Sequence, residues 1–337
     1  MNDKRILVTG HSGFKGSWMT KILQLSGYEV VGLSDDVLKY QLWNDLDLNI
    51  EEYVCDINDK EHLTNIIKKI NPSSVIHLAA QPLVSKSFID PITTLQTNIL
   101  GTANLLESLR HTDVSSIVLA TTDKVYDNIN SGVSFSETDQ LGGHDIYSSS
   151  KACMELVSKS YYLNFFADRN TSIATVRSGN VIGGGDFSAN RIIPDIVRSQ
   201  VNGQKLSVRS PGATRPWLHV IEPLLGYLKV LDKGHIGGNF SSWNFGPKLD
   251  QGMTVLQLIQ ECQKYLNFSF ELNDDKKFIE SELLQLNSQK AKNFLDWEQK
   301  FNFEETISYT ANWYSEYLLG RPANNLCEDQ INDFISR

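Results

Sequence analysis

Short apolar runs alternate with amphipathic stretches along the first half of the chain. Ile6-Leu7-Val8 enters a glycine-rich turn, and 17–26 then spaces its apolar residues as a helix does. The apolar run 30–33 is typical of a buried strand in a parallel sheet. The same alternation predicts further strands at 74–78, 116–120 and 172–176, and helices at 60–70, 95–110 and 147–166.

Strands that alternate with helices predict an α/β fold with a doubly wound parallel sheet. After Ser178 the rhythm loosens into glycine-rich and polar stretches, with helices expected at 192–202, 222–232, 255–266 and 306–319. We therefore expect two parts: residues 1–178, to which a segment around 215–245 returns, and a smaller, mixed C-terminal part at 179–337.

Composition narrows the class of protein. The 337 residues carry 31 Lys and Arg against 40 Asp and Glu, and the formal charge of −9 disfavours nucleic acid as a partner. The four cysteines are scattered without a CxxC pair, which favours a reducing compartment and predicts no metal cluster. The N-terminal residues lack signal-peptide features, and no apolar run approaches the ~18 residues of a membrane span. These features predict a cytoplasmic protein without a membrane partner.

Gly10, Gly13 and Gly16 occupy the turn between the first strand and the first helix. This spacing lets backbone N–H groups at a helix N-terminus approach a pyrophosphate, so the turn predicts a dinucleotide site. A plain tight turn is the alternative. The second predicted strand ends in Ser34, where an acid is usual, and Asp35 follows it. A carboxylate there, with no arginine nearby, favours the free 2′-hydroxyl of NAD over the 2′-phosphate of NADP.

Two further segments carry candidate chemistry. Tyr147 and Lys151 are four residues apart on a predicted helix and share one face, where an ammonium would lower the pKa of the phenol and make it a proton acceptor. Thr122, Asp123 and Lys124 follow a buried strand at its carboxyl end, where ligands of open α/β sheets bind. A solvated helix face and a capped loop with an exposed ion pair are the respective structural alternatives.

Several ordered segments resemble one family. The resemblance is to the nucleotide-sugar 4,6-dehydratases of the extended short-chain dehydrogenase/reductase superfamily, and within it to the branch that acts on CDP-glucose. It implies a Rossmann-type fold whose residues 1–178 bind NAD, and a substrate-binding part at 179–337. The segments that carry it are Gly10-His11-Ser12-Gly13-Phe14-Lys15-Gly16-Ser17-Trp18, 77–84, 122–128, 141–143, 179–186, Arg215-Pro216-Trp217 with His219-Val220, and 243–247.

The resemblance implies a dehydration of CDP-glucose to CDP-4-keto-6-deoxyglucose with regenerated NAD. Tyr147 would take the proton of the sugar 4-hydroxyl, with Lys151 holding the cofactor ribose and Thr122 binding the 4-oxygen. Asp123 would protonate the departing 6-hydroxyl. Lys124 is either the base at C5, which requires a neutral amine, or a cation that stabilises the developing enolate, and the sequence leaves both roles open.

The same resemblance implies a homodimer through the helices at 95–110 and 147–166. It also implies a product used for deoxysugars such as those of a lipopolysaccharide O-antigen. The alternatives to this function are a 4,6-dehydratase that acts on another nucleotide sugar, or a 4-epimerase, which needs no acid–base pair at C5 and C6.

The resemblance also implies which residues bind the ligands. The substrate contacts implied are Gln81, Ser87, Asn180, Arg191, Arg209 and Arg215. The cofactor contacts implied are Gly10, Ser12, Gly13, Phe14, Lys15, Gly16, Ser34, Asp35, Asp56, Ile57, Leu78, Ala79, Ala80, Thr97, Tyr147 and Lys151.

Overall fold

Seven parallel strands form the central sheet of the computed structural model, which describes residues 5–36, 40–128, 134–208, 210–234, 238–248, 253–273 and 284–337. Their spatial order is β12-β7-β5-β4-β1-β2-β3, so the chain moves outward from β1 in both directions. This confirms the predicted doubly wound α/β fold. The strands are β1 (Arg5–Thr9), β2 (Glu29–Ser34), β3 (Glu51–Val54), β4 (Ser74–His77), β5 (Ser116–Ala120), β7 (Ser172–Ser178) and β12 (Phe240–Phe245).

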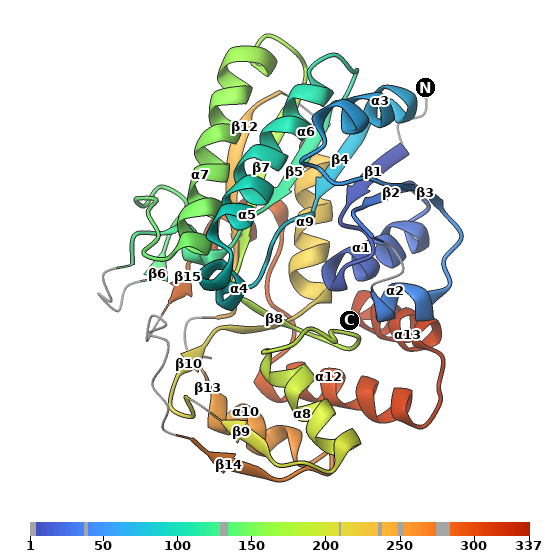
Figure 1. The fold of residues 1–337 in the computed structure, drawn as a ribbon, viewed down its shortest axis with the longest axis vertical. Helices are drawn as coiled ribbons and strands as arrows, with labels where there is room; N and C mark the ends of the chain where they lie inside the picture. Colours follow the sequence, from blue (N-terminus) through green and yellow to red (C-terminus); the bar gives the residue numbers. More distant parts are fainter. Residues whose placement is uncertain are drawn as a thin grey trace.

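Helices cover both faces of the sheet, because alternate side chains of the buried strands point to opposite faces (Figure 1). In β1, Ile6 and Val8 pack into the same apolar core as α1 (Phe14–Leu25) and α9 (Ile221–Gly234). Leu7, between them, packs into a second core with α3 (Lys60–Ile70) and α6 (Thr102–Leu109). Ile6, Leu7 and Val8 are fully buried between these two cores, which explains the apolar run at the centre of β1.

The two long helices predicted at 95–110 and 147–166 each contain a wider, π-helical segment, which lies within the first helix and ends the second. The first consists of α5 (Pro91–Leu95), a π-helical segment Gln96–Gly101, and α6. The second is α7 (Ile146–Tyr161), which continues as a π-helical segment Tyr162–Phe166. Asp145 caps the start of α7, since its carboxylate accepts a hydrogen bond from the Ser148 backbone at 2.9 Å.

Strand β12 completes the sheet from a distant part of the sequence. Phe240–Phe245 pairs in parallel register with 173–178 of β7, more than 60 residues earlier. The sequence pattern did not predict this strand, because only its last three residues are buried and its first three are polar or half-buried.

Residues beyond β7 form short sheets and helices that lie mostly to one side of the main sheet (Figure 1). Four two-stranded sheets pair β8 (Asn180–Ile182) with β11 (Trp217–His219), β9 (Leu206–Val208) with β14 (Phe270–Leu272), β10 (Thr214–Arg215) with β13 (Met253–Thr254), and β6 (Ser134–Phe135) with β15 (Gln285–Leu286). The remaining helices are α2 (Gln41–Leu46), α4 (Val84–Ile89), α8 (Ile192–Asn202), α10 (Val255–Cys262), α11 (Gln289–Leu295), α12 (Phe303–Leu318) and α13 (Ala323–Ser336). None of the helices in the described ranges is long and apolar enough to cross a membrane.

Candidate active site

A cavity of about 2060 Å³ opens at the carboxyl ends of the central strands. It reaches the point between β1 and β4 where the strand order reverses, which is the usual ligand site of an open α/β sheet. Its volume exceeds the ~300–1,000 Å³ of a pocket for one drug-sized ligand, so two ligands fit side by side.

The glycine turn forms one wall of this cavity. Gly10 adopts a left-handed backbone with φ of 69°, and a β-carbon there would lie 2.6 Å from the backbone nitrogen of Ala79. A β-carbon on Gly16 would lie 2.0 Å from the carbonyl oxygen of Gly10. The turn therefore needs glycine at both positions to close tightly between β1 and α1, and it presents the first turn of α1 to the cavity.

Residues at the ends of β2 and β3 continue this wall. Ser34 lies with its hydroxyl oxygen 2.6 Å from that of Ser12, so the end of β2 is tied to the glycine turn. The carboxylate of Asp35 accepts a hydrogen bond from the Tyr40 hydroxyl at 3.4 Å. Asp56, after β3, accepts hydrogen bonds from the backbone and side-chain nitrogens of Asn58 at 2.9 and 3.0 Å.

Tyr147 and Lys151 project from one face of α7 into the cavity, and both are buried. The ammonium nitrogen of Lys151 donates to the carbonyl oxygen of Ala120, the last residue of β5, at 3.1 Å. The phenol of Tyr147 lies close to the Thr122 side chain. Lys151 thus ties α7 to the end of β5.

Thr122, Asp123 and Lys124 lie in the short turn that follows β5. The Thr122 hydroxyl donates to the Asp123 carboxylate at 2.9 Å and accepts from the Lys124 backbone at 3.4 Å. Thr122 and Asp123 are buried, and Lys124 is half-buried. All three line the same cavity as Tyr147 and Lys151, so the structure brings the two predicted catalytic segments together.

The proton affinities of the cavity residues depart from one sequence-based prediction. Burial raises the pKa of Tyr147 to about 12, and the nearby Thr122 side chain opposes this rise only in part. The sequence predicted a lowered pKa from a neighbouring ammonium. Burial, and to a lesser extent the charge of Lys15, lowers the pKa of Lys151 to about 7. Lys151 therefore carries less positive charge at neutral pH than the sequence-based prediction assumes.

Lys15, predicted from the resemblance as a cofactor contact, adds a second buried amine to the cavity. Its side-chain nitrogen donates to the Ser178 hydroxyl at the end of β7 at 3.0 Å. Burial, followed by the charge of Arg191, lowers its pKa to about 8. Lys15 therefore places a second buried amine in the same cavity as Lys151.

The predicted substrate contacts fall into three groups. Asn180, Arg191 and Arg215 line the cavity, and Arg191 is ion-paired with Asp186 at 3.0 Å. Gln81 also lines it, but its amide is engaged by Thr94 and Leu83 within the protein. Ser87 is buried outside the lining, where its hydroxyl donates to the carbonyl of Val84. Arg209 lies outside the described residues.

Every predicted cofactor contact lines the cavity. These residues come from the glycine turn and the first turn of α1, from the ends of β2 and β3, from the segment after β4, from the π-helical segment Gln96–Gly101, and from α7. They are Gly10, Ser12, Gly13, Phe14, Lys15, Gly16, Ser34, Asp35, Asp56, Ile57, Leu78, Ala79, Ala80, Thr97, Tyr147 and Lys151.

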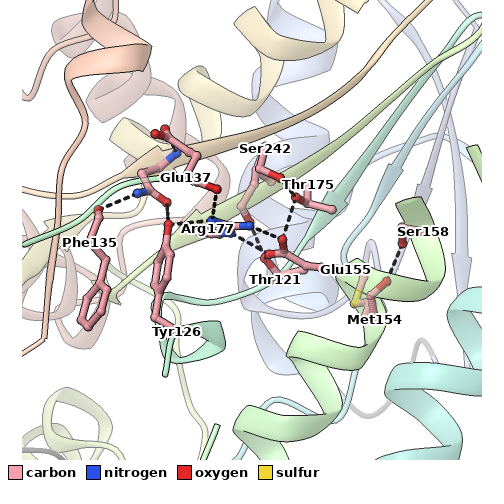
Figure 2. Close-up of polar contacts among 12 residues, drawn as sticks. Thr121, Tyr126, Phe135, Glu137, Met154, Glu155, Ser158, Thr175, Arg177 and Ser242 are labelled. Carbon is pink, nitrogen blue, oxygen red and sulfur yellow. Dashed lines mark hydrogen bonds and ion pairs between the residues drawn. The ribbon is translucent and has the colours of Figure 1, made fainter. Parts of the chain in front are cut away.

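Sequence reasoning missed a buried ion pair beside the site (Figure 2). Arg177 of β7 and Glu155 of α7 are 2% and 3% exposed, and the Arg177 Nε donates to Glu155 Oε1 at 2.8 Å. The sequence holds two signals for this pair. Glu155 follows Lys151 by four residues on the same helix face, and Arg177 is a charged residue directly after the predicted strand 172–176.

The fold and the site together define an α/β protein of the short-chain dehydrogenase/reductase type. Residues 7–310 match the family model described as GDP-mannose 4,6 dehydratase, and the chain belongs to that family. This confirms the resemblance inferred from the motifs.

Named relatives agree with this placement. The chain is 37% identical to a CDP-glucose 4,6-dehydratase of Salmonella typhimurium, over 99% of this chain and 96% of the relative. Its fold is similar to that of MoeE5 in complex with UDP-glucose and NAD, with a TM-score of 0.81, 21% identity, and 93% and 99% of the two chains covered. It is also similar to a UDP-glucose 4-epimerase of Thermus thermophilus in complex with NAD, with a TM-score of 0.79, 24% identity, and 92% and 98% covered.

Proposed function

We propose that this protein is an NAD-dependent hydro-lyase that converts CDP-glucose to CDP-4-keto-6-deoxyglucose and water. One observation carries the proposal: a Tyr147–Lys151 pair and a Thr122–Asp123–Lys124 turn face the same large cavity, whose other wall is the glycine turn. The first pair suits oxidation at C4, and the turn suits elimination across C5 and C6. The 37% identity to a CDP-glucose 4,6-dehydratase supports the choice of nucleotide sugar.

The cavity residues fit NAD. The first turn of α1, with Ser12 and Lys15, offers backbone donors and a cation to a pyrophosphate. Asp35 at the end of β2 suits a free 2′-hydroxyl and would repel a 2′-phosphate. In this proposal residues 1–178, with the returning segment 215–245, hold the cofactor, and 179–337 hold most of the nucleotide sugar. When bound, NAD accepts a hydride from C4 of the sugar and returns it to C6, so it is not consumed.

In this proposal, different residues around the sugar carry out different proton transfers. Tyr147 removes the proton of the 4-hydroxyl as the phenolate, which its raised pKa makes a minor form at neutral pH. The protonated fraction of Lys151, whose pKa is about 7, favours that phenolate, and Lys151 holds the cofactor ribose. Thr122 donates to the 4-oxygen. The resulting 4-ketone acidifies the C5 proton. Loss of that proton, with protonation of the 6-hydroxyl by Asp123, releases one water, and a proton returns to C5 when the hydride reaches C6.

Lys124 has two candidate roles in this elimination. A neutral amine would remove the C5 proton, whereas an ammonium would stabilise the enolate oxygen that develops at C4. Lys124→Met removes both, and Lys124→Arg keeps only the charge. If Lys124→Arg retains the rate of water loss, the charged role holds, and if it behaves as Lys124→Met does, the base role holds.

The arginines of the cavity supply the diphosphate contacts. Arg191 and Arg215 offer guanidinium groups, whose paired donors match phosphate oxygens, and Asn180 adds an amide between them in the lining. We propose Arg209 for the same task on the basis of the resemblance alone. Gln81, whose amide is engaged within the protein, contributes shape to the sugar end of the cavity.

The first test measures the mass of the nucleotide sugar after incubation with the protein and NAD. CDP-glucose, dTDP-glucose, UDP-glucose and GDP-mannose are each supplied separately. We expect CDP-glucose to lose one water and the others to remain unchanged. Loss of water from another nucleotide sugar would keep the reaction and reject the substrate. An unchanged mass with conversion to the C4 epimer would identify a 4-epimerase instead.

We further propose a homodimer formed through α6 and α7. Leu156 and Leu163 are 57% and 59% exposed on the second of these helices and its continuation, and Leu100 is 57% exposed on the segment before the first. Such apolar side chains on one face favour burial against a second copy. Light scattering should give twice 38.0 kDa, and Leu156→Glu should give the monomer. A wild-type monomer would reject this interface.

We assign the reaction to the cytoplasm, since the four cysteines are free thiols and three of them are buried. Use of the product for O-antigen deoxysugars stays a prediction. Recovery of the protein with unmodified thiols from a cytoplasmic fraction is the expected result, and recovery from the periplasm would contradict the assignment.

A further inference from the structure

The turn that carries Thr122, Asp123 and Lys124 is bounded by two side chains that reach the same buried ion pair. Before the turn, the Thr121 hydroxyl donates to the Glu155 carboxylate at 2.7 Å. After it, the Tyr126 hydroxyl accepts a hydrogen bond from Arg177 at 2.6 Å. Figure 2 shows Tyr126 beside Arg177 and Thr121 beside Glu155.

The ion pair itself is held on several sides. Arg177 donates to Glu155 through two of its nitrogens, and its guanidinium carbon lies 4.8 Å from the centre of the Tyr126 ring. Thr175 of β7 donates a further hydrogen bond to Glu155 at 3.1 Å. A buried ion pair with this many partners has one arrangement rather than several, because breaking any contact leaves a charge or dipole without compensation.

Tyr126 is fixed at its other side as well. Its hydroxyl donates to the side-chain oxygen of Asn244 on β12 at 2.8 Å, and the Asn244 backbone donates to Glu137 at 2.8 Å. The end of the turn is therefore tied to the last strand of the sheet, whereas its beginning is tied to α7. Lys151, one helical turn before Glu155, donates to Ala120 immediately before Thr121.

We propose that Glu155 and Arg177 are positioning residues that clamp both ends of the 121–126 segment and so hold Asp123 and Lys124 in place for the elimination at C5 and C6. The proposal rests on the proposed function for its chemistry. The phenol and ammonium of α7 are held by the helix itself, whereas Asp123 and Lys124 depend on the turn. Loosening the clamp should therefore slow elimination more than oxidation.

The test releases the ends of the segment without leaving a buried charge unpaired. Thr121→Val and Tyr126→Phe each remove one hydroxyl that contacts the pair, and the double variant removes both. Thr175→Val is the matched control, because it also removes a hydroxyl donor to Glu155 but lies on β7, outside the segment. Melting temperatures of all variants identify any general loss of folding.

Turnover of the nucleotide sugar gives the first readout. Hydrogen bonds to charged groups are strong enough that losing two should lower kcat about 10- to 100-fold, with KM changed less than about twofold. The near-ultraviolet absorbance of reduced nicotinamide should rise in the steady state of the double variant, since oxidation outruns elimination. Thr175→Val should show neither change. Equal effects in the control and the double variant, or none in the double variant, would overturn the clamp.

Hydrogen–deuterium exchange in the protein without substrate gives the second readout. Peptides covering 121–126 should exchange faster in the double variant than in the wild type. In Thr175→Val they should exchange at the wild-type rate. If the wild type dehydrates none of the nucleotide sugars, the proposed function fails, while the exchange rates still decide whether the segment is clamped. Unchanged exchange in the double variant would reject the clamp whatever the activity.

Discussion

Replacing Glu222 by glutamine should remove part of the pH dependence of folding stability. Glu222 lies in the first turn of α9 and is 1% exposed. Its carboxylate accepts hydrogen bonds from the backbone nitrogens of Lys300 and Phe301 at 2.8 and 3.1 Å, which join α9 to the segment before α12. Burial raises the pKa of this carboxyl from 4.5 to about 7, and the backbone hydrogen bonds oppose the rise only in part.

The sign and size of the change in the free energy of unfolding follow from the pKa of Glu222 in the unfolded chain and in the folded protein. A raised pKa in the folded protein means that the folded state holds a proton that the unfolded chain has lost between pH 4.5 and about 7. The stabilisation is complete below pH 4.5 and is lost as the pH rises through 7. Each pH unit in this window is worth about 1.4 kcal/mol, so the free energy of unfolding falls by about 3 kcal/mol.

Urea unfolding of the wild type and Glu222→Gln between pH 4.5 and 8 measures this directly. Glutamine keeps the acceptor oxygen and carries no charge. The free energy of unfolding of the variant should therefore rise by about 3 kcal/mol relative to that of the wild type as the pH rises across the window. Glu304→Gln, an exposed position on α12, should stay within about 0.5 kcal/mol of the wild type throughout. A constant difference between Glu222→Gln and the wild type would refute the reasoning.

Three further outcomes are expected. Tyr147→Phe should lower kcat for water loss at least about 100-fold, since general base catalysis contributes that much, while NAD binding measured by calorimetry persists; near-normal turnover would exclude the phenol as proton acceptor. Asp123→Asn should slow water loss about 100-fold and accumulate reduced nicotinamide, seen by absorbance; a slow reaction without that signal would move the role of Asp123 to oxidation. Gly184→Ala should destabilise the protein by more than about 2 kcal/mol in urea unfolding, because its β-carbon would lie 2.0 Å from the buried Trp313 ring, whereas Gly212→Ala, with no atom within 4 Å, should be neutral.

The central sheet and the helices between its strands could be predicted from the sequence, because the pattern of apolar residues is clear there. Strands such as β5 and β7 are buried on both faces and read as apolar runs, and the helices between them have one apolar face. Strand β12 lacks that signal, since its partner β7 supplies the pairing and only its second half is buried. The short helices α2 and α4 have six residues each, too few to show a helical period.

The candidate site also contains features that the sequence predicts and features that only the structure shows. Residues within a motif, such as Gly10 or Lys151, are recognisable because their spacing along the chain carries the chemistry. The pKa of Tyr147 was predicted with the wrong sign, since spacing identifies a neighbouring ammonium but says nothing of burial. Glu155 and Arg177 are 22 residues apart on two different elements, so the sequence marks each residue separately and only the folded structure shows that they meet.

The late return of β12 has a consequence for synthesis on the ribosome. Strand β7 is buried along its whole length, and one of its two edges is covered only by Phe240–Phe245. A nascent chain that has emerged as far as residue 230 therefore exposes an apolar strand edge open to pairing with another chain. Premature termination in this region should yield insoluble fragments, and a chaperone that binds extended apolar segments should engage the chain in this interval.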